Sequence, residues 1–178
     1  MSVLDDFEGW VAGKPPARPA QGLAVAATSA QAATPVPAAF TEMRGIRNNN
    51  PGNIDRDGTA WQGLAADQSS DPRFCVFVDA QHGIRALALV LLTYQEVHDL
   101  DTIRGVISRW APAVENDTEA YISAVTGRTG IGADTVIDLR HLPVARLVVA
   151  AIIAQENADY AYPPEVLDAG LTLAGVAA

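Results

Sequence analysis

The sequence is poor in cysteine, histidine and positive charge. Its 178 residues include one cysteine, three histidines and 12 lysines and arginines against 21 aspartates and glutamates. One cysteine, Cys75, excludes an intramolecular disulfide framework. The histidines His82, His98 and His141 lack metal-ligand spacing, so we expect no metal and no other cofactor. The net charge of −9 argues against the basic surface of a nucleic-acid-binding domain.

Long apolar runs are also missing. No stretch of about 18 apolar residues is free of charge, so no segment is expected to span a bilayer. Residues 1–8 are acidic, whereas a secretory signal peptide starts with positive charge and continues with an apolar run. We therefore expect no signal peptide, and action outside the cytoplasm would need another delivery route. No serine lies in a nucleophile elbow, and no glycine loop has a phosphate-binding pattern.

Composition divides the chain into two parts. Residues 1–41 are rich in Ala, Pro, Ser and Thr and lack periodicity, which predicts a flexible, disordered linker. Within it, residues 1–12 carry apolar side chains near helical spacing, which indicates either a docking segment for a partner or a disordered end. Residues 42–178 are expected to form one folded domain.

The front of this domain predicts turns and short strands. Residues 48–53 combine Asn, Pro and Gly, which are the residues that build tight turns. Asp57-Gly58 lies between two candidate short strands and predicts a hairpin, and 74–78 predicts a third strand. We therefore expect a small β-hairpin sheet.

The remainder predicts helices. Their expected starts are Asp79, Asp101-Thr102 and Asp117, each a residue type that caps helices. A fourth helix is almost wholly apolar and ends at Glu156, and a short fifth one runs from Pro163 through Leu173. The expected class is α+β and mostly helical, with no βαβ alternation.

Glu156 is the most informative residue. It ends the apolar helix that starts near Leu142. A carboxyl group in apolar surroundings favours its protonated form, which is how a glutamic acid serves as a general acid near neutral pH. The alternative is a solvated helix C-terminus.

Two resemblances accompany this pattern. Residues 44–170 resemble bacteriophage and prophage proteins that open with Arg-Gly-Ile-Arg-Asn-Asn-Asn-Pro-Gly-Asn-Ile, as 44–54 does, and that are often labelled virion or structural proteins. The order hairpin, Trp61-Gln62-Gly63, strand, helix, then 117–121 is similar to that of lysozyme-like glucosaminidases and lytic transglycosylases. In those enzymes the helix that carries the catalytic Glu comes first, whereas here it comes last. This resemblance implies a circularly permuted lysozyme-like domain. Ala158 stands where those enzymes have Gly.

The lysozyme-like resemblance implies site residues. Glu156 would be the catalytic acid, and Tyr121 would lie over the catalytic centre, although core packing is an equal alternative for it. The amides of the Asn-rich turn and Trp61 would contact sugar, or would only build the turn and fill the core. The substrate-binding candidates are Tyr121, Asn49, Asn50, Asn53 and Trp61.

Other carboxylates are possible partners or rivals of Glu156. Asp55, Asp57 and Glu115 are possible helpers, but Asp55 and Asp57 flank a turn and are more typical of turn capping, and Glu115 precedes a helix start. Glu42 lies beside the linker with no apolar helix before it. It therefore ranks below Glu156.

The sequence thus predicts a phage-type muralytic enzyme that cleaves peptidoglycan glycan strands, either as a hydrolase or as a lytic transglycosylase. We expect a virion-associated protein, attached through residues 1–12 and acting in the bacterial periplasm and cell wall, with an endolysin as a variant. The alternative from another class is a non-catalytic virion structural or wall-binding protein. A muralytic peptidase has no metal or thiol arrangement to support it.

Overall fold

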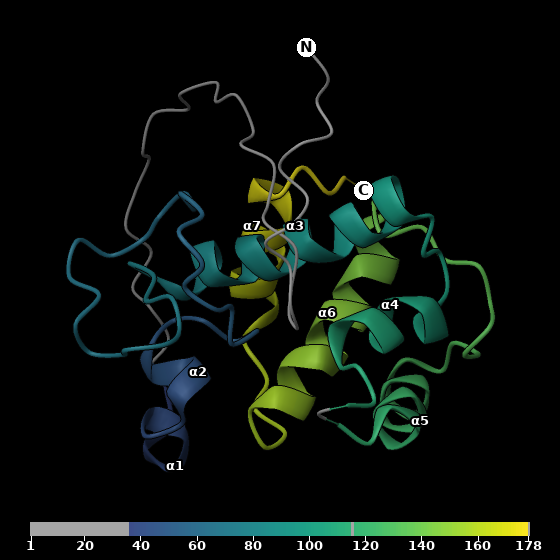
Figure 1. The fold of residues 1–178 in the computed structure, drawn as a ribbon, viewed down its shortest axis with the longest axis horizontal. Helices are drawn as coiled ribbons and strands as arrows, with labels where there is room; N and C mark the ends of the chain where they lie inside the picture. The colour runs from purple at the N-terminus through teal and green to yellow at the C-terminus, as the bar shows by residue number, and fades with distance from the viewer. Residues whose placement is uncertain (1–35, 115, 178) are drawn as a thin grey trace.

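The computed structural model describes residues 36–114 and 116–177, and most of the regular structure in them is helical. Figure 1 shows α3 and α7 together at the top and α6 running downward through the middle, with α4 and α5 to its right and α1 and α2 at the lower left. The most extensive helix pairings are α3 with α7 and α5 with α6. The helices are α1 (Ala38–Thr41), α2 (Arg44–Arg47), α3 (Ala80–His98), α4 (Ile103–Trp110), α5 (Thr118–Thr129), α6 (Leu142–Glu156) and α7 (Pro164–Leu173).

The predicted starts of the middle helices are confirmed. The side chains of Asp79, Thr102 and Asp117 accept hydrogen bonds from backbone N–H groups in the first turns of α3, α4 and α5. Each cap satisfies a donor that the helix itself leaves unpaired. Gly130 ends α5 in the left-handed conformation, at φ 70°. The cap at Asp117 fixes where α5 begins, and the corner between α4 and α5 contributes to the candidate site.

α6 is the central helix. It contacts α5, α7 and α3, and its buried side chains are all aliphatic. Burial of apolar surface on more than one side explains why its sequence shows almost no polar face. Residues buried along it are Ala145, Val148, Val149, Ala151, Ile152 and Ile153. Its C-terminal end points to the bottom of Figure 1, between the segment that carries α2 and the helix α5.

The prediction of an α+β fold with a small hairpin sheet is wrong. Residues 36–114 and 116–177 contain no strand; the front of the domain has isolated antiparallel bridges between Asp55 and Phe74 and between Leu64 and Phe77. Gly58 does adopt a positive φ of 92°. However, the backbone before it bonds to residues 73–75 and not across the turn.

Side chains take the place of the expected ladder. The amide of Asn50 donates to the carbonyls of Ile54 and Cys75, and its oxygen accepts the N–H of Ile54. Gln68 likewise donates to the carbonyls of Ala65 and Val76 and accepts the N–H of Val76. Because these amides satisfy backbone groups that a sheet would pair, the segment folds as an ordered irregular layer. The hairpin sheet that the lysozyme-like resemblance implied is therefore absent from the described residues.

The end of the predicted linker is partly ordered. α1 covers Ala38–Thr41, and the ring of Phe40 lies 4.9 Å, centroid to centroid, from that of Tyr160 in the connection between α6 and α7. The predicted docking segment 1–12 and the rest of the linker up to residue 35 lie outside the described residues.

Candidate functional site

Glu156 lies at the centre of a group of hydrogen bonds that joins four parts of the chain. The indole N–H of Trp110 and the hydroxyl of Tyr121 both donate to its Oε1, each at 3.0 Å. The amide of Asn53 donates to its Oε2 at 3.1 Å. Asn53 and Glu156 are 103 residues apart in the sequence. The end of α6 therefore meets the Asn-rich segment on one side and the α4–α5 corner on the other.

The position of each donor follows from local structure. Trp110 is the last residue of α4, and Tyr121 lies near the start of α5; they are 5% and 8% exposed. The hydroxyl of Thr118 donates to the carbonyl of Ala111 at 2.6 Å, which fixes the corner between the two helices. Asn53 adopts a left-handed φ of 47°, a conformation that Asn tolerates better than most residues. Glu156 itself is partly exposed.

Tyr121 acts as a donor in this group. Burial, and after it the neighbouring Glu156 carboxylate, raise the pKa of its phenol above the ordinary value. The hydroxyl therefore keeps its proton over the physiological range and donates to Oε1. The indole of Trp110 can only donate. Both groups at Oε1 thus present hydrogen to the carboxyl oxygen.

Asn157 fastens the Asn-rich segment to the end of α6. Its buried amide donates to the carbonyl of Pro51 at 2.8 Å and to that of Ile153 at 2.9 Å. Gly45 packs against it so closely that a Cβ at position 45 would lie 2.2 Å from Asn157 Oδ1. The residue that follows Glu156 thereby sets the distance between the helix end and the segment that carries Asn53.

The structure divides the predicted sugar contacts into two groups. Tyr121 and Asn53 lie at Glu156. Asn49 donates to the carbonyl of Phe77 at 3.2 Å, and Asn50 is fully buried with its amide engaged by Ile54 and Cys75. Trp61 is 7% exposed and belongs to the hydrophobic core. Asn49 and Asn50 therefore build the loop, and Trp61 packs beneath it.

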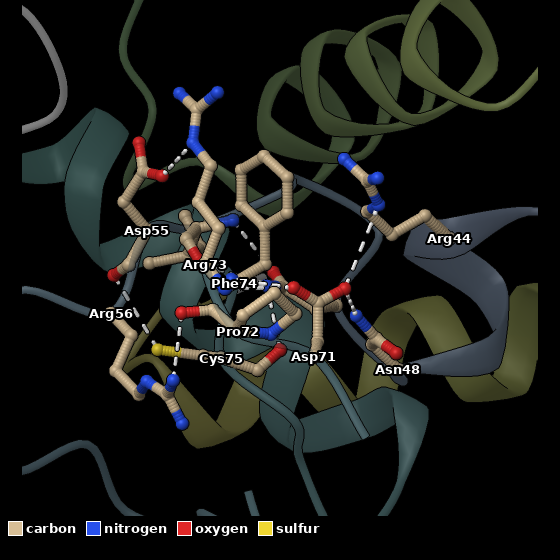
Figure 2. Close-up of polar contacts among 11 residues, drawn as sticks. Arg44, Asn48, Asp55, Arg56, Asp71, Pro72, Arg73, Phe74 and Cys75 are labelled. Carbon is tan, nitrogen blue, oxygen red and sulfur yellow. Dashed lines mark hydrogen bonds and ion pairs between the residues drawn. The ribbon is translucent and has the colours of Figure 1, made fainter. Parts of the chain in front are cut away.

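A second polar cluster centres on Asp71, which is 3% exposed (Figure 2). Its Oδ1 accepts the N–H groups of Arg73 and Phe74, and its Oδ2 accepts the amide of Asn48 at 2.8 Å. Arg44 lies 3.6 Å from the same oxygen. The bond from the Phe74 N–H is the largest influence on the Asp71 carboxyl and, with the other donors and against the opposing effect of burial, lowers its pKa to about 2. This cluster joins the Asn-rich segment to residues 71–74.

The other carboxylates considered from the sequence are engaged away from Glu156. Asp55 accepts a hydrogen bond from Arg73 at 2.7 Å, and Asp57 accepts the N–H of Thr59, as a turn-capping residue does. Glu42 is exposed at the end of α1. Glu115 lies outside the described residues. In the part of the chain that is described, no set of three or more His, Cys, Asp or Glu could hold a metal ion, and no helix has the length and apolarity needed to cross a membrane.

Sequence reasoning did not assign Trp110 to the site. Trp110 falls on the apolar face of its helix with Ile103, Val106 and Ile107, which indicates core packing. The available signal was its polar end, because a buried indole N–H usually finds an acceptor. A hollow of about 430 Å³ lies on the same α4–α5 connection, lined in part by Ser108, Pro112, Asn116 and Glu119.

The comparisons with known proteins agree with the predicted phage relationship. No protein-family model matches the chain. Over 122 residues, which are 67% of this chain and 74% of the relative, the sequence is 42% identical to protein P5 of Pseudoalteromonas phage PM2. Identity at this level over most of both chains implies a common fold. The chain therefore belongs to the family of phage proteins that includes protein P5 of phage PM2.

Proposed function

We propose that the protein is a phage muralytic enzyme that cleaves the glycan strands of peptidoglycan, with Glu156 as the general acid. The observation that carries the proposal is the group formed by Glu156, Asn53, Trp110 and Tyr121. A partly exposed carboxyl group at the end of an apolar helix, with an amide and a phenol beside it, offers a proton donor and groups that bind sugar hydroxyls and N-acetyl groups.

The chemistry needs one proton at one oxygen. Glu156 would deliver its proton to the glycosidic oxygen while the sugar ring develops oxocarbenium character. After the bond breaks, the resulting carboxylate would take a proton from water, or from a hydroxyl of the substrate that closes an anhydro ring. The first route gives a hydrolase and the second a lytic transglycosylase.

The relationship to a phage protein supports a proposal for delivery. A phage protein that cleaves cell walls acts on the bacterial envelope, either carried by the virion during entry or released inside the host before lysis. The predicted docking segment 1–12 favours attachment to a virion protein, as the acidic chain would gain no electrostatic attraction to an anionic wall.

The decisive experiment incubates the purified full chain with isolated bacterial cell walls and identifies the products by mass spectrometry. Soluble fragments with anhydro ends mean a transglycosylase, and fragments with reducing ends mean a hydrolase. We expect Glu156→Gln to lower the rate at least about 100-fold, the usual size of a general-acid contribution. Glu165→Gln, an exposed glutamate in the first turn of α7, is the matched control and should keep full activity.

One observation favours the second candidate, a non-catalytic virion protein. The hydrogen bonds of Glu156 to Asn53, Trp110 and Tyr121 are all internal, so the residue also links α4, α5, α6 and the Asn-rich segment. Under this alternative the wild-type chain leaves cell walls intact, and Glu156→Gln changes only the thermal stability. Cell-wall cleavage that persists in Glu156→Gln would overturn the assignment of the acid.

A further inference from the structure

We infer that the two oxygens of Glu156 have separate roles: Trp110 and Tyr121 hold Oε1 as positioning residues, and Oε2 beside Asn53 is the oxygen that gives and takes the proton. This inference deepens the proposed function and rests on it only where enzyme activity is measured. It concerns Trp110, a residue that the sequence analysis did not assign to the site.

The argument begins with acceptor capacity. A carboxylate offers about two acceptor positions on each oxygen. Oε1 receives two donors, Trp110 Nε1 and Tyr121 Oη, both at 3.0 Å. Among the described residues, Oε2 receives one donor, Asn53 Nδ2, at 3.1 Å. Within the described part of the chain, the open acceptor position of the carboxyl group is therefore on Oε2.

The donors also differ in how firmly they are held. Trp110 and Tyr121 are more than nine-tenths buried and stand at the facing ends of two helices. Their side chains are fixed by packing, and the Tyr121 phenol keeps its proton. Asn53 is only partly buried and projects from a loop. A ligand that approaches the carboxyl group can replace the Asn53 contact at lower cost than either contact to Oε1.

A proton on Oε2 fits this arrangement and a proton on Oε1 does not. A proton on Oε1 would compete directly with two fixed hydrogen-bond donors for the lone pairs of that oxygen. With the proton on Oε2, Oε1 remains a carbonyl-type oxygen that still accepts both bonds. The cost then falls on the hydrogen bond between Oε2 and Asn53.

The first test follows hydrogen bonds directly and does not depend on activity. Uniformly ¹⁵N-labelled full-length protein is titrated with acid, and the indole signal of Trp110 and the side-chain amide signals of Asn53 are recorded by NMR. Trp110→Phe and Asn53→Ser assign the two signals. We expect the Asn53 amide to shift strongly as Glu156 takes its proton while the Trp110 indole stays nearly in place.

The control for other titrating groups is Glu156→Gln, in which these shifts should disappear. The ion pair of Arg128 with Asp159, which joins α5 to the turn after α6, is retained in that variant. A larger shift of the Trp110 indole than of the Asn53 amide would place the proton on Oε1 and overturn the inference, whatever the activity of the protein.

The second test uses cell-wall cleavage. Tyr121→Phe removes the hydroxyl alone. Trp110→Phe removes the N–H group together with the five-membered ring of the indole. We expect each to lower kcat by about 10- to 100-fold through loss of carboxyl orientation, with KM changed by no more than about 2-fold. Tyr94→Phe is the matched control, since Tyr94 is also a buried tyrosine but belongs to α3, and loss of its hydroxyl should leave kcat unchanged.

The two tests separate the possible failures. If wild-type protein cleaves no cell wall but the Asn53 amide responds to acid as expected, the proposed function fails and the assignment of the oxygens stands. If cleavage occurs and Tyr121→Phe raises KM while leaving kcat unchanged, Tyr121 contacts substrate instead of positioning Glu156, and the inference fails.

Discussion

The buried carboxylate of Asp71 leads to a prediction about the stability of the protein in acid. Its pKa is lowered from 3.8 to about 2, first by the hydrogen bond from the Phe74 N–H and then by the bonds from Arg73 and Asn48. At 1.36 kcal/mol per pH unit, this lowering corresponds to about 2 kcal/mol of folding stability. Because the folded-state pKa is the lower one, this contribution is fully present above about pH 4 and is lost as the pH falls toward 2.

The perturbation is Asp71→Asn. The new amide keeps one oxygen for the N–H groups of Arg73 and Phe74, but its NH₂ group then faces the donating amide of Asn48. Near neutral pH we expect a loss of about 2 kcal/mol, the usual range for a buried hydrogen bond to a charged group. The variant has no carboxylate to protonate at this position. The difference between wild type and variant should therefore shrink between pH 4 and pH 2.

The assay is urea unfolding followed by circular dichroism at several pH values from 2 to 7. Asp138→Asn is the control, because Asp138 is an exposed residue whose Oδ1 accepts the Arg140 N–H and whose replacement keeps that acceptor. It should stay within about 0.5 kcal/mol of wild type. A difference between wild type and Asp71→Asn that remains constant from pH 7 to pH 2 would refute the reasoning.

Three further predictions concern backbone strain, close packing and the thiol. Ala158 adopts φ 47°, so Ala158→Gly should raise stability by about 0.5–1 kcal/mol in thermal unfolding, and a loss of stability would contradict this. A Cβ at Gly83 would lie 1.8 Å from the Asn49 carbonyl oxygen, so Gly83→Ala should lower the free energy of unfolding by more than about 2 kcal/mol. A Cβ at Gly127 in α5 would have nothing within 4 Å, so Gly127→Ala should leave that free energy unchanged or raise it by up to about 1 kcal/mol in urea unfolding. Cys75 is 1% exposed, and burial raises the pKa of its thiol to about 11, so at pH 8 a thiol reagent should react only as fast as the chain unfolds. Rapid labelling of the folded protein would disprove this.

Local signals in the sequence were sufficient to predict the longer helices, α3 to α7. Asp79, Thr102 and Asp117 cap helices where their residue types predict caps, and Gly130 ends α5. Such signals depend on a few neighbouring residues, so no tertiary information is needed to interpret them. α1 and α2 escaped prediction because each has only four residues and depends on contacts made elsewhere, such as that between Phe40 and Tyr160.

The sheet was predicted wrongly because the pattern of residues does not reveal where polar side chains bond. Residues 54–55 and 74–77 have a composition typical of strands, and they do lie beside each other. Asn50 and Gln68 then take up backbone groups that a ladder would have paired. The choice between a side chain and a neighbouring strand as partner depends on packing across the whole front of the domain. A single sequence does not carry that information.

The contacts of the Asn-rich segment show that the specific motif at 44–54 serves mainly to build a loop. Gly45 fits against Asn157, Asn48 bonds to Asp71, Asn50 holds its own loop, and only Asn53 reaches Glu156. The demands on these residues are steric and structural, so the motif indicates a loop held at a fixed distance from the end of α6. Replacement of Glu156 therefore tests whether this arrangement supports only the fold or also a reaction. A family member with this loop and an apolar residue at the position of Glu156 would leave the donors equivalent to Trp110 and Tyr121 without their acceptor, a cost of about 1–3 kcal/mol for each buried donor. A relative that lacks the proposed activity should therefore carry, at the position of Glu156, a residue that still accepts hydrogen bonds, such as Gln.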